Sequence, residues 1–197
     1  MSAPSGVAVS KLGANLRPRA ARLRAMLSAA PVASAIPCGR SVALFDRLPE
    51  RLVLEGFRRW TAGYATGDLT HWEEVWNLHA GALGPRTARV VVDRLAKFVK
   101  TVRDWSICPI ACFPGGCRHI CRQECFALAM VAASQNRDLD CLASAMRHLL
   151  DPEGHEEAML PALAYAEAMK DSDLMLMPVP KIVVEEIAGR PLHERLH

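Results

Sequence analysis

Apolar side chains recur at helical intervals along most of this 197-residue chain. The clearest run covers residues 85–105, where apolar positions alternate spacings of four and three while charged residues occupy the opposite face. This division predicts an amphipathic helix with one face packed on a core. Its predicted buried stripe consists of Val91, Leu95, Phe98, Val102 and Trp105.

Two helices are predicted before this one. The first runs over residues 49–66 and ends at the turn Thr66-Gly67-Asp68, because glycine readily terminates a helix. The second begins at Thr70, which together with Glu73 matches a capping box, in which a hydroxyl and a carboxylate bond to free backbone N–H groups. The inner face expected for this second helix consists of Trp72, Val75, Trp76, His79 and Leu83.

Three further helices are predicted, from near Cys117 to about residue 135, over 139–149 and over 153–170. The β-branched run Ile182-Val183-Val184 favours a short strand or an extended strap. We therefore expect an all-α fold, an irregular bundle of about five to six helices. The predicted organisation is a flexible basic tail over 1–45, a helical domain over 46–172 and a C-terminal extension over 173–197.

Charge is distributed unevenly along the chain. Residues 1–60 carry ten Lys/Arg against three Asp/Glu, whereas residues 151–197 carry four against ten. A basic N-terminal region is typical of contact with nucleic acid or with an acidic protein partner. The residues expected in that contact are Arg17, Arg19, Arg22, Arg24, Arg58 and Arg59. A second reading of residues 17–35 is a cleaved secretory signal, because arginines precede a small apolar stretch there.

Hydropathy, cysteine content and the absence of catalytic motifs limit the classes of protein to which this chain can belong. No apolar run approaches the length needed to cross a bilayer, so no transmembrane segment is expected. Seven cysteines in a chain of this size favour a reducing compartment, and we expect the protein to be cytoplasmic. No phosphate-binding loop, nucleophile elbow or metalloprotease motif is present, which argues against an enzyme. The expectation is an accessory or regulatory protein with a protein partner.

The candidate chemistry lies in five cysteines within eighteen residues: Cys108, Cys112, Cys117, Cys121 and Cys125. Thiolates are soft, strongly donating ligands that suit iron–sulfur clusters, zinc and copper(I). Prolines and glycines over residues 106–116 predict a loop whose backbone can bend around a metal. The Cys-x3-Cys spacing resembles that of helical-bundle proteins that store copper(I), although those proteins spread such pairs over several helices.

Helix geometry limits which of these cysteines can act together. Residues four apart on a helix lie about 6 Å apart, whereas residues eight apart are separated by about 12 Å along the axis. If the helix starts at Cys117, the expected site joins Cys108 and Cys112 of the loop to Cys117 and Cys121. If the helix starts later, the set Cys112, Cys117, Cys121 and Cys125 can surround a larger cluster.

Two other interpretations of the cysteines remain open. Free cysteine is among the most buried residue types, so these side chains can serve packing alone with no cofactor. A redox switch between neighbouring thiols is the other interpretation. The leading functional hypothesis is a regulatory protein that holds an iron–sulfur cluster, or alternatively zinc or copper(I). Nucleic-acid binding and a non-catalytic helical interaction subunit are the competing hypotheses.

Overall fold

Helix α5, Pro85–Trp105, forms where the sequence has its clearest amphipathic pattern. Four of the five predicted stripe residues are fully buried, and Trp105 is half-buried beside them. Pro85 occupies the first helical turn, where the missing N–H of proline removes no helical hydrogen bond. The amphipathic prediction for this segment is therefore confirmed.

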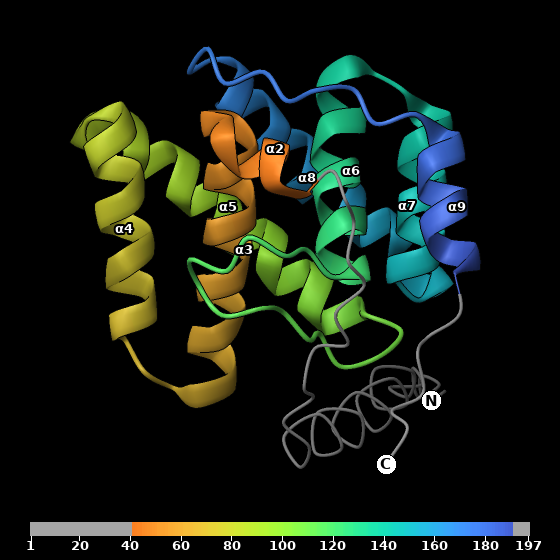
Figure 1. Ribbon diagram of the computed structural model, residues 1–197, viewed down its shortest axis with the longest axis horizontal. Helices are drawn as coiled ribbons and strands as arrows, with labels where there is room; N and C mark the ends of the chain where they lie inside the picture. The colour runs from red at the N-terminus through yellow and green to blue at the C-terminus, as the bar shows by residue number, and fades with distance from the viewer. Residues whose placement is uncertain (1–40, 191–197) are drawn as a thin grey trace, which may run out of the picture. The chain divides into compact units, whose positions relative to one another are not determined.

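The computed structural model describes residues 41–190, all of which belong to one compact unit. Within this range the chain is helical without a β-strand, and one isolated bridge joins Ser106 to Leu150. This confirms the predicted all-α bundle (Figure 1). Besides α5, the helices are α2 (Ser41–Asp46), α3 (Leu48–Thr66), α4 (Thr70–Leu83), α6 (Arg122–Asn136), α7 (Leu139–Leu149), the short 3-10 helix η1 (Pro152–Gly154), α8 (His155–Lys170) and α9 (Lys181–Gly189).

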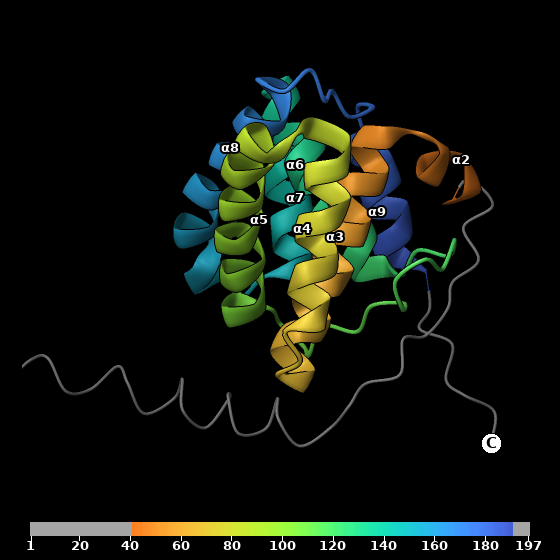
Figure 2. The ribbon, with the colours of Figure 1, turned by 90° about the vertical axis from the view of Figure 1, so that its left-hand side faces the viewer.

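Helix α6 is the central element of the described fold. It packs on α3, α7, α8 and α9, and Figures 1 and 2 place it among these helices. Every residue from Phe126 to Gln135 is buried, so no side of this part of the helix faces water. A helix enclosed all round in this way forms the middle of a core. The other helices cover it and leave its N-terminal end beside the preceding loop.

Helix α4 departs from its predicted form in two ways. The expected capping box at Thr70 does not form, because the Asp68 carboxylate accepts the Thr70 N–H at 2.9 Å instead. Val75 and His79 are fully buried, as predicted for the inner face, but Trp76 is 38 % exposed and lies outside it. Burial also lowers the pKa of His79, whose Nδ1–H donates to the Val75 carbonyl at 2.8 Å.

The two ends of the described chain also correct the sequence predictions. Helix α2 begins at Ser41, inside the predicted tail, so ordered structure starts before Phe45. The predicted strand or strap at Ile182–Val184 is wrong, because these residues belong to α9. Val184 and Ile187, three residues apart, are buried where α9 packs on α6 and α7, and this contact favours a helix over local β propensity. Among the described residues, no helix combines the length and apolar content required to cross a bilayer.

Candidate functional site

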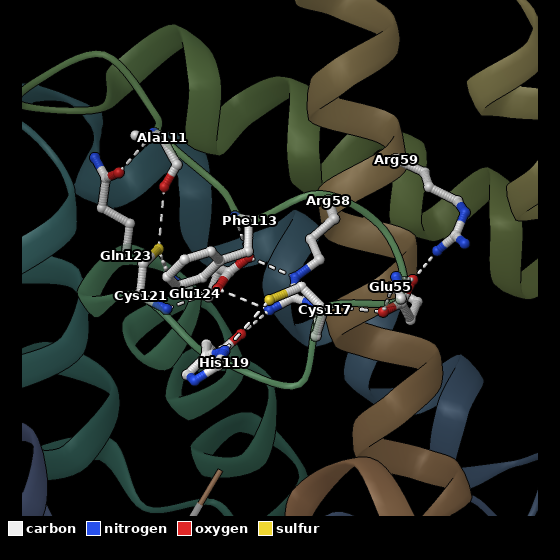
Figure 3. Close-up of polar contacts among 11 residues, drawn as sticks. Glu55, Arg58, Arg59, Ala111, Phe113, Cys117, His119, Cys121, Gln123 and Glu124 are labelled. Atoms are coloured by element: carbon white, nitrogen blue, oxygen red, sulfur yellow. Dashed lines mark hydrogen bonds and ion pairs between the residues drawn. The ribbon is translucent and has the colours of Figure 1, made fainter. Parts of the chain in front are cut away.

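The five clustered cysteines lie on and just after an irregular segment, residues 106–121, which we call the cysteine loop. It connects α5 to α6 and passes across α3 (Figures 1 and 3). The Ile107 N–H donates to the Leu149 carbonyl at 3.1 Å, which attaches the start of the loop to the end of α7. Further along, the backbone has no helix or sheet partners, so its polar groups require side chains to bond them.

Arg58 of α3 supplies two of these bonds. Its side chain is 1 % exposed, and its Nε donates to Glu124 Oε1 at 2.6 Å. The same guanidinium donates to the backbone carbonyls of Cys117, at 2.5 Å, and of His119. One buried cation thus holds the backbone of the loop at two residues and neutralises a carboxylate of α6.

Two aromatic rings enclose this guanidinium. The Arg58 Cζ atom lies 4.8 Å from the ring centre of Phe45 and 6.0 Å from that of Phe113. Phe45 belongs to α2 and Phe113 to the cysteine loop, so the two rings come from different segments. Such cation–π contacts are strongest where water is excluded, as it is around Arg58.

Two carboxylates complete the network. Glu124 is fully buried and accepts the N–H groups of Phe113, at 3.2 Å, and of Cys121, at 2.7 Å. Glu55 accepts the Gly116 N–H at 3.0 Å and pairs with Arg58 and Arg59 (Figure 3). The two glutamates balance the two arginines, so the charges buried under the loop are compensated and hydrogen-bonded, as burial of ions requires.

Cys121 has a local structural role that the sequence analysis did not predict. Helix α6 begins at Arg122, not near Cys117, and Cys121 is its N-cap. The Cys121 sulfur accepts the Glu124 N–H at 3.5 Å while Glu124 bonds back to the Cys121 N–H. A thiol therefore replaces the hydroxyl of a capping box. The Cys121 S–H also donates to the Ala111 carbonyl at 3.0 Å.

This helix start changes which cysteines share a helical face. The expected helix pair Cys117/Cys121 is wrong, because Cys117 lies in the loop. The pair four residues apart at the helix start is instead Cys121 and Cys125. The limit on residues eight apart therefore does not apply to Cys117 and Cys125.

The thiols differ in environment. Cys108 is exposed and its sulfur accepts a hydrogen bond from Gln123 Nε2 at 3.2 Å, while Cys117 Sγ lies 3.5 Å from His119 Nδ1. Burial raises the pKa of Cys112 well above its usual range, and the Glu124 carboxylate and Cys121 raise it further. Burial and the Glu124 carboxylate raise the pKa of Cys121 in the same way.

Three of the cysteines are electrostatic neighbours, but their side chains do not converge on one point. Cys121 raises the pKa of Cys112 electrostatically, and Cys125, which is half-buried against the core, raises that of Cys121 in the same way. No disulfide links the cysteines of residues 41–190 to one another. In the same range, no three Cys, His, Asp or Glu side chains already converge as a metal site would require.

Two of the six arginines predicted to contact nucleic acid are described by the structure, and both are paired with carboxylates. Arg58 is buried in the network above, and Arg59 is paired with Glu55 and with Glu74, the latter at 2.9 Å. These two arginines therefore do not form a solvent-facing basic surface. The remaining four predicted contacts, Arg17, Arg19, Arg22 and Arg24, lie outside the described residues.

The sequence analysis missed Glu55, Gln123 and Glu124, which hold the loop. A signal for Glu124 was present, since Cys121 and Glu124 have capping-box spacing if a thiol is admitted as the cap. Gln123 bonds the Ala111 N–H at 2.7 Å, and no local pattern indicates that contact. Comparison with known proteins finds no matching family model, no matching curated protein and no matching solved structure.

Proposed function

We propose that this chain is a small accessory or regulatory protein that binds a thiophilic metal centre through its cysteine loop. An iron–sulfur cluster is the first candidate, with zinc and copper(I) as alternatives. The observation that carries the proposal is the buried network of Arg58, Glu55 and Glu124. It holds the backbone of a cysteine-rich loop in one conformation, although the loop contributes little to the apolar core.

The residues present suit such a group chemically. Thiolates are the ligands of iron–sulfur clusters and of many zinc sites, and their negative charges need compensation. Arg58 supplies a positive charge that favours the thiolate form of Cys112, and the N-terminus of α6 supplies another at Cys121. Hydrogen bonds and charge next to the sulfur atoms are features by which proteins adjust such centres.

The ligand set we propose is Cys112, Cys117, Cys121 and Cys125. Cys121 and Cys125 lie one turn apart at the start of α6, and Cys112 is the electrostatic neighbour of Cys121. Cys117 belongs to the loop, whose bend can bring its sulfur toward the other three. Cys108, which is exposed and bonded to Gln123, is left out of the set.

Metal binding in this set must displace protons. The pKa values of Cys112 and Cys121 are both raised, so both side chains are protonated thiols at neutral pH. Ligation requires the thiolate, and each proton released makes metal affinity rise by about tenfold per pH unit. Zinc affinity, measured by competition with a chelator, is therefore expected to increase steeply from pH 6 to pH 8.

The test is anaerobic purification of the full chain with analysis of iron, zinc, copper and acid-labile sulfide. We expect stoichiometric metal, lost in Cys112→Ser and Cys125→Ser. The matched control is Cys141→Ser, because Cys141 is also buried but bonds the Val179 carbonyl far from the loop along the chain. Full chain that takes up none of these metals, even after reconstitution with iron and sulfide, would exclude the proposal. Equal loss of metal in Cys141→Ser would also exclude it.

A reducing compartment such as the cytoplasm suits this function, because thiols there stay available as ligands. The alternative of nucleic-acid binding would depend on arginines that lie outside the described residues, and Arg58 does not support it. A salt-dependent shift of DNA mobility by metal-free protein would favour that alternative over the metal site.

A further inference from the structure

Helix α4 lies at the edge of the described bundle (Figure 1). Its main contacts are with two helices, α3 and α5. The other helices of residues 41–190 therefore leave one side of α4 largely uncovered. Along that side Leu69 is 62 % exposed and Trp76 is 38 % exposed, while Trp72, Ala80 and Leu83 are half-buried. Large apolar residues gathered along one helical edge, rather than scattered singly, mark an interaction surface.

These five residues form a stripe whose spacing is symmetric. Leu69, Trp72, Trp76, Ala80 and Leu83 follow one another at intervals of three, four, four and three, with Trp76 at the centre. The stripe covers about 21 Å of helix. Its spacing reads the same in both directions, so a second copy running antiparallel presents the same stripe.

Antiparallel pairing about Trp76 gives a reasonable fit of side-chain sizes. Trp76 meets its own copy, Leu69 meets Leu83 of the second copy, and the large Trp72 meets the small Ala80. Alternating large and small side chains lets two helices approach and interdigitate. An interface of this kind, in which each patch contacts itself through a two-fold axis, is the commonest form of protein self-association.

The aromatic base of the stripe is rigid. Trp72 packs on Trp60 and Tyr64 of α3, with ring centres 6.0 and 5.7 Å apart. Its indole lies so close to Gly63 that any Cβ there would approach it to 2.4 Å. A preformed aromatic surface loses little conformational entropy on association, and tryptophan is the residue type most enriched among interface hot spots.

Charge also favours this pairing. Asp68 is exposed beside the N-terminal end of the stripe. Arg86 is exposed in the first turn of α5, at the opposite end of α4 from Asp68. The two-fold arrangement brings Arg86 of each copy toward Asp68 of the other, so opposite charges meet at both ends.

We propose that the Leu69–Leu83 edge of α4 is a dimer interface in which a second copy of this chain packs antiparallel about Trp76. The inference does not depend on the metal site. The first test is sedimentation velocity of the full chain over a range of concentrations, with Trp76→Glu as the disrupting variant. We expect a concentration-dependent dimer whose dissociation constant rises at least about tenfold in the variant.

A charge exchange tests the antiparallel register. Arg86→Glu alone and Asp68→Lys alone are each expected to weaken the dimer several-fold, and the double variant Asp68→Lys/Arg86→Glu is expected to restore it. Circular dichroism confirms that each variant keeps its helices. A chain that stays monomeric at every concentration overturns the proposal, as does a dimer that Trp76→Glu leaves unchanged. Failure of the double variant to recover association overturns the antiparallel register.

Discussion

Two irregular segments cross the surface of this helical protein, and they are held by different chemistry. The cysteine loop is held by a network of buried charges, whereas residues 171–180, which we call the methionine strap, are held by a buried neutral amide together with an ion pair whose arginine is partly exposed. Each segment faces the same physical problem, because backbone outside helices and sheets still needs hydrogen-bond partners. Comparing the two segments shows which substitutions destabilise each of them.

Gln135 of α6 is the anchor of the methionine strap. Its Nε2 donates to the Leu174 carbonyl at 2.9 Å, and its Oε1 accepts the Leu176 N–H at 2.9 Å. Cys141 adds an S–H bond to the Val179 carbonyl at 3.0 Å, and Glu50 accepts the Met177 N–H at 2.8 Å. One buried amide thus satisfies both a donor and an acceptor of the strap without carrying a charge, and the buried carboxylate of Glu50 is paired with the partly exposed Arg47.

The cysteine loop is bonded more heavily. Arg58 and Glu124 are both almost inaccessible to water, and each bonds the other as well as loop backbone. Losing one partner leaves an uncompensated charge in the interior, which is far more costly than losing a neutral bond. The loop is therefore held rigidly but depends on single residues, whereas the strap tolerates more change.

The largest effect is expected from Arg58→Met. This change leaves the Glu124 carboxylate buried without its cation, and the free energy of unfolding should fall by about 3–5 kcal/mol. Chemical denaturation measures the loss. Arg51→Met, an exposed arginine on the same helix, is the matched control and should change stability by less than about 0.5 kcal/mol. Equal effects of the two changes would contradict the structural role of the ion pair.

Gln135→Leu should have an intermediate effect. It leaves the Leu176 N–H and the Leu174 carbonyl without their partner, and a buried unsatisfied polar group costs about 1–3 kcal/mol. The neighbouring change Asn136→Ala removes a bond within α6 only and should cost less. A loss from Gln135→Leu as large as that from Arg58→Met would remove the distinction between charged and neutral anchors.

A smaller effect is expected at the cap of α6. Cys121→Ala removes the side-chain acceptor for the Glu124 N–H and should cost about 1 kcal/mol, whereas Cys121→Ser supplies a hydroxyl and should cost less. Thermal unfolding of the two variants side by side measures the difference. Identical melting temperatures for alanine and serine would show that the sulfur does not act as a cap.

The last prediction concerns the reactivity of individual thiols and not the free energy of unfolding. Burial and Asp138 raise the pKa of Cys141 to about 11, so its reaction with a thiol reagent at pH 8 should be slow and should accelerate as the pH approaches 11. Exposed Cys108 should react first. Gln135→Leu should speed labelling of Cys141 but not of Cys112, and Arg58→Met should do the reverse. If either variant speeds the labelling of both Cys141 and Cys112, loosening one segment also loosens the other.

Much of the helical architecture was predictable from local patterns. The stripe of α5 and the glycine at the end of α3 act over one or two turns, so neighbouring residues alone indicate them. The start of α6 was predicted too early, because the pattern around Cys117 does not distinguish a loop from a first helical turn. Ile182–Val184 was misjudged because its contacts with α6 and α7 outweigh local β propensity.

The sequence by itself determined where most of the helices form and that five thiols gather in the loop after the third predicted helix and at the start of the fourth. Only the tertiary structure decided that Arg58, predicted as a surface contact, is buried against Glu124, sixty-six positions away. It also decided that Trp76 is exposed while Val75 beside it is buried. The reason is that burial and the choice of ion-pair partner depend on which distant segments meet, and a local pattern contains no record of those contacts.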